Sequence, residues 1–485
     1  MRYTRATADT FIQTNKQNLL TDYRLNYHLM SEFGWMNDPN GFVQYKGQYH
    51  LFYQHYPYKS VWGPMHWGHA VSRDLIAWEH MPVALAPDQA YDKDGCFSGS
   101  AIEKDGSLYL MYTGHIITGP DKDNDYIQKQ NIAVSKDGVM FEKLADNPVI
   151  DNSQIPDGAS QKDFRDPKVF ERDGSYYVVL GSNDGKGNGQ ILLYRSSDLL
   201  HWTFVSVLAQ SDGTLGDNWE CPDLFVLGNR DVLLMSPQRV PAQGDNYKNL
   251  HSTTYMLGEF DALNGKFRYD ACVPVDYGFD FYAPQTMQDD QGRRIMIGWM
   301  DMWETDMPTQ QGHGWAGAMT LPRELVLQGD KVLFLPVKEV EGYRKNLYEM
   351  TDVALDGELL LDTEGDSYEL LVRFYAGSST EFGLKLRTGN EEETVLGYSV
   401  NDRLLTLNRD RSGIGPQGER RTSVDLADGK LTLRVFVDRC SVEVFIQGGE
   451  KVMTARIYPS KDSRGIQVYS QGASVIQSLQ KWDIR

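Results

Sequence analysis

The sequence has few of the features that mark helical, membrane-spanning or disulfide-bonded proteins. Helical periodicity is rare along its 485 residues, and no apolar run approaches the roughly 20 residues of a membrane span. The four cysteines form neither a C-x-x-C pair nor a dense framework. The N-terminal segment lacks the apolar core of a secretory signal. These absences favour a cytoplasmic protein, with the mature form of a secreted protein as the alternative.

Positive charge is also scarce. The chain has 48 lysines and arginines against 67 aspartates and glutamates, a formal net charge of −19. Nucleic acids and anionic membranes bind to basic surfaces. We therefore expect neither nucleic acid nor a membrane as a partner. The sequence makes no prediction of oligomeric state.

Aromatic residues and short alternating runs are abundant. Aromatic side chains make up 12% of the chain, with 27 Tyr and 10 Trp. They suit β-strands, and they also suit the apolar faces of sugar rings. Short alternating runs separated by Gly, Asp and Asn predict an all-β protein, and the length predicts two domains.

The first two thirds of the chain contain a repeat. Five similar runs each consist of a polar or aromatic entry, a strand, a turn and a second strand. They begin at Asp38, Phe97, Asp166, Cys221 and Tyr282. A second signature falls between them, marked by Asp74, Asp137, Asp198 and Asp261 at spacings of 63, 61 and 63 residues. A fixed period with about four short strands per unit predicts a five-bladed β-propeller.

The repeat stops at about Thr351, where the alternation becomes cleaner. The run "LTLRVFVDRCSVEVFIQ", from Leu431, predicts a hairpin with one apolar face and a turn at Asp438-Arg439. We therefore expect a C-terminal antiparallel β-sandwich. The predicted boundaries are an N-terminal extension over 1–26, the propeller over 27–334, a linker over 335–350 and the sandwich over 351–485.

Three of the five entries carry an acid: Asp38, Asp166 and Glu220. Taken singly, each is typical of a turn or a structural ion pair. The innermost strands of a propeller converge on its axis, so the three carboxyl groups should share one pocket. Glycosidic cleavage needs an ionised carboxylate and a protonated carboxyl group facing one pocket.

The neighbours of these acids suggest their protonation. Arg165, beside Asp166, should keep that carboxylate ionised. Glu220 lies between Trp219 and Cys221, so desolvation should raise its pKa, as a proton donor requires.

The motifs resemble those of glycoside hydrolase family 32. The resemblance rests on "WMNDPNG" at 35–41, "FSGSA" at 97–101, "FRDPKVF" at 164–170, "WECPDLF" at 219–225, "DFYAPQ" at 280–285 and "DRCSVEVF" at 438–445. It extends from about Tyr27 into the C-terminal sandwich.

The resemblance implies a retaining β-fructofuranosidase without a metal or other cofactor. Asp38 would be the nucleophile, Glu220 the general acid and base, and Asp166 the group that holds sugar hydroxyls in the transition state. The implied fructosyl subsite consists of Trp35, Asn37, Gln54, Trp62, Phe97, Ser98, Arg165 and Trp299. Tyr282 is either a further contact or a core residue.

Several alternatives remain for the function. Sucrose 6-phosphate and sucrose are the expected substrates, with short fructans as the alternative within the family. A phosphate would need Lys or Arg at the pocket rim, which the sequence does not identify. An inverting arabinanase or xylosidase fits the "NDPNG" and "WECPD" contexts poorly. A non-catalytic fructan-binding propeller would not need all three acids.

Three other motifs have simpler interpretations. His66 and His69 have no third metal ligand spaced nearby. "GSNDGKGNGQ" at 181–190 lacks the G-K-[ST] of a phosphate loop and predicts a hairpin loop. The Arg-rich stretch at 408–421 predicts a solvated loop, with an accessory contact as the alternative.

Overall fold

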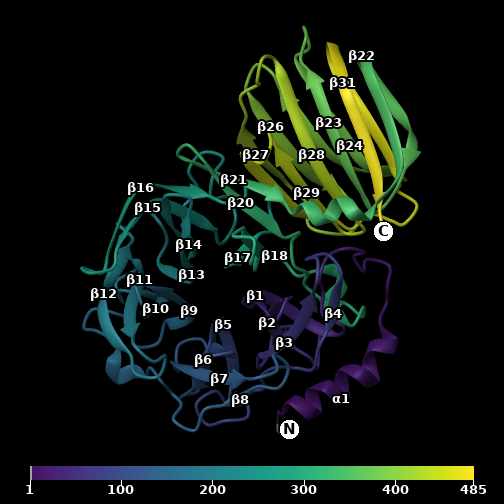
Figure 1. Cartoon of the computed structure of the whole chain (residues 1–485). Coiled ribbons are helices and arrows are strands. Elements are labelled where there is room, and N and C mark those ends of the chain that lie inside the picture. The colour runs from purple at the N-terminus through teal and green to yellow at the C-terminus, as the bar shows by residue number, and fades with distance from the viewer. Residues whose placement is uncertain (1–2) are drawn as a thin grey trace.

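The computed structural model describes residues 3–485 and shows a ring of five small β-sheets followed by a C-terminal β-sandwich (Figure 1). This confirms the predicted all-β class, the five blades and the sandwich. The sandwich lies against one side of the ring, and the C-terminus ends close to the junction between them (Figure 1).

The N-terminal segment contains a helix that was not predicted from the sequence. α1 spans Arg5–Asn15 and is followed by a 3-10 turn, η1, at Lys16–Asn18. Thr4 caps α1 through a reciprocal pair of bonds with Thr7, which satisfies backbone N–H groups at its start. Ala8 and Ile12 pack against Val83 of the first blade. Within residues 3–485, no helix is long and apolar enough to cross a membrane.

Each blade contains four antiparallel strands, and the first of these lies nearest the axis (Figure 1). Blade 1 contains β1 (Gly34–Tyr45), β2 (Gln48–Tyr56), β3 (His66–Ser72) and β4 (Trp78–His80). Blade 2 contains β5 (Gly95–Lys104), β6 (Ser107–Ile117), β7 (Tyr126–Ser135) and β8 (Glu142–Lys143). Blade 3 contains β9 (Phe164–Arg172), β10 (Ser175–Asn183), β11 (Gly189–Ser196) and β12 (Thr203–Gln210). Short 3-10 turns lie at Asn152–Gln154 (η2) and Pro308–Gln310 (η3).

The last two blades follow the same plan. Blade 4 contains β13 (Asn218–Leu227), β14 (Arg230–Gln238), β15 (Thr254–Asp261) and β16 (Lys266–Pro274). Blade 5 contains β17 (Tyr282–Gln288), β18 (Arg294–Trp299), β20 (Arg323–Gln328) and β21 (Lys331–Pro336). The four repeat-marking aspartates each accept backbone N–H bonds in the turn after the third strand of a blade. This local bond explains the period of the second signature.

The ring closes through a return of the chain to blade 1. After β18 the chain crosses to β1, where the short strand β19 (Trp315–Ala316) pairs in parallel with Gly34 and Trp35. Gly317 follows with φ of +92°, and a Cβ atom there would lie 1.9 Å from the carbonyl oxygen of Met36. Glycine is required at this position by both the backbone angle and the close approach.

The innermost strands are bulged where they enter the axis. Ladder register breaks occur after Met36 in β1, Phe97 in β5, Glu220 in β13 and Tyr282 in β17, and β9 breaks register between Arg165 and Lys168. Asp166 and Cys221 have φ of +64° and +46°. A bulge re-aims a side chain relative to the regular pleat, so the entry residues turn toward the axis.

The sandwich is built from ten strands in one continuous hydrogen-bonded sheet. These are β22 (Arg344–Glu364), β23 (Tyr368–Tyr375), β24 (Glu381–Gly389), β25 (Glu392–Ser399), β26 (Leu404–Arg411), β27 (Glu419–Ser423), β28 (Lys430–Asp438), β29 (Ser441–Ile446), β30 (Lys451–Arg456) and β31 (Gly465–Ile484). The long β31 pairs with β24 through its first half and with β23 through its second half. The predicted apolar face of the β28–β29 hairpin is buried in the sandwich core.

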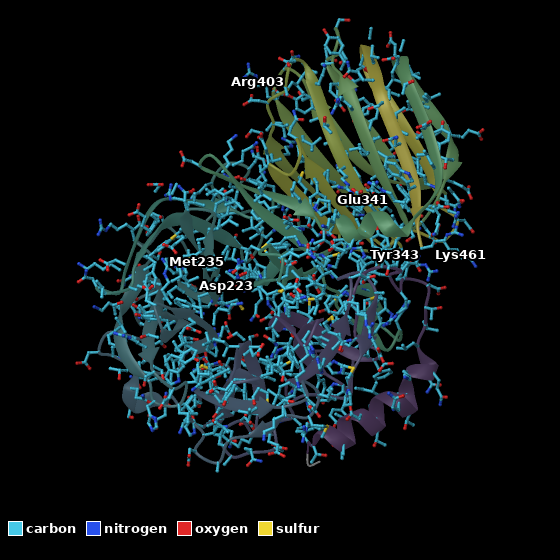
Figure 2. All side chains as sticks on the ribbon, viewed as in Figure 1. Asp223, Met235, Glu341, Tyr343, Arg403 and Lys461 are labelled. Atoms are coloured by element: carbon cyan, nitrogen blue, oxygen red, sulfur yellow. The ribbon has the colours of Figure 1, made fainter. Side chains whose placement is uncertain are left out.

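The segment predicted as a linker is structured. Residues 335–350 contain the end of β21, the 3-10 helix η4 (Lys338–Tyr343) and the start of β22. Figure 2 shows Glu341 and Tyr343 at the junction of the two domains. Tyr343 donates a hydrogen bond of 2.5 Å to Asp74 of blade 1, and Glu341 accepts one of 3.1 Å from Arg434 of the sandwich. These bonds tie the connecting segment to both domains.

Candidate active site

A cavity of about 400 Å³ opens on the propeller axis, and all five blades contribute to it. It is lined by Asn37, Asp38, Gln54, Trp62, Phe97, Ser98, His115, Lys122, Asp123, Tyr126, Gln128, Arg165, Asp166, Glu220, Gln238, His251, Tyr282 and Trp303. The three predicted acids therefore share one pocket.

Asp38 is held at the bulge of β1. It accepts hydrogen bonds from the Ser98 hydroxyl at 2.8 Å and from the Asn37 amide at 3.1 Å. The Trp35 indole N–H donates to the Asn37 oxygen at 2.7 Å, which fixes the orientation of that amide. Burial and the nearby charge of Glu220 raise the pKa of Asp38 to about 6.

Asp166 comes from the entry of β9. Its carboxylate accepts the Cys221 backbone N–H at 3.0 Å, and its own N–H donates to the Thr113 hydroxyl at 3.0 Å. Burial and the charge of Glu220 raise the pKa of Asp166 to about 7. The Cys221 sulfur lies 3.5 Å from Asp166 Oδ2 and 3.7 Å from Asp38 Oδ2, so one thiol contacts both acids.

Glu220 is the most heavily bonded of the three acids. It accepts hydrogen bonds from Arg165 Nε at 3.0 Å, from Gln238 Nε2 at 2.8 Å and from the Tyr282 hydroxyl at 2.6 Å. The carboxylate is thus fixed from three different blades.

Arg165 was predicted to keep Asp166 ionised. Its charge does lower the pKa of Asp166, but burial and the charge of Glu220 outweigh it. The guanidinium of Arg165 binds Glu220 and, at 2.8 Å, Asp163, and it makes no hydrogen bond to Asp166 within residues 3–485. The Arg165 guanidinium is thus held between the carboxylates of Asp163 and Glu220.

Six of the eight predicted subsite residues line the cavity: Asn37, Gln54, Trp62, Phe97, Ser98 and Arg165. Trp35 and Trp299 are buried behind it and do not belong to its lining. Their ring centroids lie 5.6 Å and 4.9 Å from that of Trp303, which faces the cavity. Trp303, rather than Trp35 or Trp299, therefore lines the cavity.

Most of the cavity wall outside the entry motifs was not predicted from the sequence. The missed residues are His115, Lys122, Asp123, Tyr126, Gln128, Gln238, His251 and Trp303, and they lie on later strands or in loops. His115 stacks face to face on Phe97 with ring centroids 4.3 Å apart, and burial and Arg165 lower its pKa to about 4. An uncharged imidazole thus extends the aromatic wall. Tyr282, for which the sequence allowed two roles, bonds Glu220.

The other motifs have structural explanations. His66 bonds the carbonyl oxygen of Pro64, and His69 bonds His50. No group of His, Cys, Asp and Glu within residues 3–485 is arranged to hold a metal ion. The Gly-rich stretch 181–190 forms the β10–β11 turn, as predicted. The prediction of a solvated loop at 408–421 is wrong for Arg409, which is buried and pairs with Asp280 at 2.7 Å.

The chain matches known families and proteins over nearly its whole length. The family model described as "Glycosyl hydrolases family 32 N-terminal domain" matches residues 28–336, and "Glycosyl hydrolases family 32 C terminal" matches 339–483. The chain is 42% identical to the raffinose invertase of Escherichia coli, covering 93% of this chain and 92% of that protein. It is 39% identical to the sucrose-6-phosphate hydrolase of Zymomonas mobilis, covering 98% and 94%.

A solved structure agrees with both matches. A mutant of the GH32 β-fructofuranosidase of Bombyx mori, in complex with sucrose, superposes with a TM-score of 0.88 at 38% identity, covering 99% of this chain and 98% of that chain. Family models and relatives thus cover the propeller and the sandwich alike. The chain belongs to glycosyl hydrolase family 32.

Proposed function

We propose that this protein is a retaining β-fructofuranosidase that hydrolyses sucrose and sucrose 6-phosphate. The observation that carries the proposal is the convergence of Asp38, Asp166 and Glu220 from three blades on one cavity. The relatives named as sucrose-6-phosphate hydrolase and raffinose invertase supply the substrate class.

Asp38 is suited to attack the fructosyl anomeric carbon. At pH above about 6 its carboxyl group is mostly ionised. Attack forms a covalent fructosyl-enzyme ester while the bond to the leaving sugar breaks. Ser98 and Asn37 orient the carboxylate, so little reorganisation is needed on the way to the transition state.

Glu220 is suited to protonate the leaving oxygen and later to activate water. The charge of Glu220 acts on both Asp38 and Asp166, so the protonation of these neighbouring carboxyl groups is linked. Because the pKa of Asp166 is about 7, the cluster retains a proton near neutral pH. We propose that this proton passes to Glu220 when sugar hydroxyls bind Asp166 and stabilise its anion. Tyr282 and Gln238 hold Glu220 in place during both steps.

The cavity also bears on the choice between sucrose and its phosphate. Its two cationic side chains within residues 3–485 are Arg165 and Lys122. Arg165 is already bound by Asp163 and Glu220, whereas Lys122 is exposed at the rim beside Asp123. We propose Lys122 as the group that meets a sugar phosphate. The four cysteines are free thiols, which supports the proposal of a cytoplasmic location.

Asp38→Asn and Glu220→Gln test the function directly. Each should lower kcat for sucrose by at least about a thousandfold, because each removes a group that makes or breaks a covalent bond. Circular dichroism and Tm should show a folded protein. Asp123→Asn is the matched control, since it neutralises an exposed acid on the same cavity and should retain activity.

Near wild-type turnover in Asp38→Asn or Glu220→Gln would contradict the proposal. The anomeric configuration of a product trapped with methanol distinguishes retention from inversion. Comparing kcat/KM for sucrose, sucrose 6-phosphate, 1-kestose and inulin then ranks the substrates, and a preference for inulin would favour the fructan alternative.

A further inference from the structure

Two buried arginines of the sandwich bind two buried aspartates of blade 5. Arg456, at the end of β30, contacts Asp280 at 3.0 Å and Asp301 at 2.6 Å. Arg409, in β26, contacts Asp280 at 2.7 Å. All four side chains are at most 6% exposed. The cluster pairs two positive with two negative side chains across the domain interface.

Asp280 connects this cluster to Glu220, the proposed general acid. Asp280 also accepts the Arg456 backbone N–H at 2.7 Å, and the backbone N–H of Phe279 donates to Thr454 of β30 at 2.8 Å. The Arg409 guanidinium lies 3.8 Å from the ring centroid of Phe279. Two residues after Asp280, Tyr282 begins β17 and donates to Glu220 at 2.6 Å. The sandwich therefore fixes the backbone from which Tyr282 reaches the acid.

Asp301 connects the same cluster to Trp303 in the aromatic wall of the cavity. Asp301 follows β18 and accepts the backbone N–H of Met302 at 2.6 Å. The next residue, Trp303, faces the cavity and is 38% exposed. Its ring packs on Trp35 and Trp299, so its position depends on the course of the chain through Asp301.

A buried ionic cluster contributes little net free energy to the association of two domains. Desolvation of four charges offsets most of their attraction, and an apolar contact of similar size would hold the domains at least as well. Guanidinium groups instead supply directed, rigid contacts. This directionality applies at Asp280, which accepts hydrogen bonds from both guanidinium groups and lies two residues before Tyr282. Asp301, two residues before Trp303, is held by an ion pair with Arg456.

We propose that Arg456 and Arg409 are positioning residues, through which the sandwich places Tyr282 against Glu220 and Trp303 against the sugar. The inference rests on the proposed function. In this arrangement the catalytic pocket of the propeller is completed by a domain that contributes none of its lining residues within 3–485.

Asp301→Asn is the most direct test, because it weakens the Arg456 contact without changing side-chain size. We expect KM for sucrose to rise by about fivefold or more while kcat changes by less than about twofold, since Trp303 contacts the bound sugar rather than the reacting bond. Assays at pH 8 keep Asp301 ionised in the wild type, because burial and Asp280 raise its pKa to about 7 although Arg456 lowers it. Arg456→Lys keeps the positive charge but loses the planar guanidinium with its paired N–H donors. It should also raise KM for sucrose.

Asp438→Asn is the matched control. Asp438 is also a fully buried interdomain carboxylate, but it bonds His28 and the backbone of Asn26 and Tyr27, away from β17 and the loop after β18. It should lower Tm and leave kcat and KM unchanged well below that temperature. An Asp301→Asn variant with wild-type KM would overturn the inference, as would a wild-type KM in Arg456→Lys if Asp301→Asn does not fold. A wild-type protein that fails to cleave sucrose would instead overturn the proposed function.

Discussion

At the scale of single residues, the site holds three acids closer together than their charges favour. The raised pKa values of Asp38 and Asp166 show that the pocket by itself resists full ionisation. Such clusters reduce stability in the free protein and are retained where catalysis needs them.

The pH dependence of stability follows from these shifts. The pKa of Asp166 rises from 3.8 in the unfolded chain to about 7 in the folded protein. The folded state therefore binds more protons between these values, and its stability falls as pH rises from about 4 to about 7. Asp166→Asn removes this loss of stability at higher pH, and the amide oxygen of the new side chain can still accept the Cys221 backbone N–H.

We expect Asp166→Asn to be inactive yet more stable than the wild type at pH 8, by on the order of 2 kcal/mol. Tm measured from pH 4 to pH 8 should fall less steeply in the variant. Asp123→Asn, at the exposed rim, should keep the wild-type slope. If Tm fell equally steeply with pH in Asp166→Asn and in the wild type, the result would argue against a proton bound by Asp166 and its neighbouring acids.

Single residues could be predicted where a short motif encodes them. Asp38, Asp166 and Glu220 begin inner strands, and period alone places such positions on the axis. Trp303 was missed because it lies in an irregular loop whose course depends on a contact with Arg456, far away in the sequence. The pairing of Arg165 with Glu220 was missed because it requires the relative placement of two blades, which no local pattern contains.

At the scale of elements, the strand that carries Asp38 depends on its parallel partner. β19 pairs with β1 directly before the Asn37-Asp38 bulge. The blade repeat predicted β1, but β19 is two residues long and falls outside the repeat, so no sequence pattern indicated it. The helix α1 was missed for a related reason, because its few buried residues make a weak apolar stripe.

Gly317→Ala should disrupt this closure. The added methyl group would meet the Met36 carbonyl oxygen at 1.9 Å and would also strain the positive φ. We expect a loss of at least about 3 kcal/mol in unfolding free energy, together with reduced activity because Asn37 and Asp38 follow Met36. Urea denaturation and kcat for sucrose measure the two effects.

Gly312→Ala separates strain from contact. Gly312 has a similar φ of +82°, but no atom lies within 4 Å of the position that an added methyl group would take. The substitution should cost only about 1 kcal/mol and retain activity. Equal effects of the two substitutions would mean that the contact with Met36 is unimportant.

At the scale of the whole molecule, buried ions recur along the domain interface. His28, in the segment before β1, bonds Asp438 at 2.9 Å and Glu443 at 3.0 Å in the sandwich. Arg323 of blade 5 bonds Glu443 at 2.9 Å. The propeller and sandwich are therefore expected to unfold together rather than as independent domains.

His28 should make the stability of this interface depend on pH in the alkaline range. Burial lowers its pKa, but the bonds to Asp438 and Glu443 outweigh burial and raise the pKa from 6.5 to about 9. Its contribution to stability is full below pH 6.5 and is lost as pH rises through about 9. Tm should therefore decline over this range in the wild type and decline less in His28→Gln.

His201→Gln is the control for this effect, because His201 also pairs with an aspartate but is 88% exposed in its side chain. It should reproduce the wild-type decline. If Tm of His28→Gln fell at alkaline pH as steeply as that of the wild type, groups other than His28 would be responsible for the decline.

The parallel pairing of β19 with β1 has a further consequence for biosynthesis. The strand that carries Asp38 is synthesised long before β19, and its edge is covered only after Trp315 and Ala316 have been made. A contact of such long sequence separation forms late and slowly. Until then the first blade presents an open strand edge beside Asp38, so a growing chain must keep this strand from pairing with other chains.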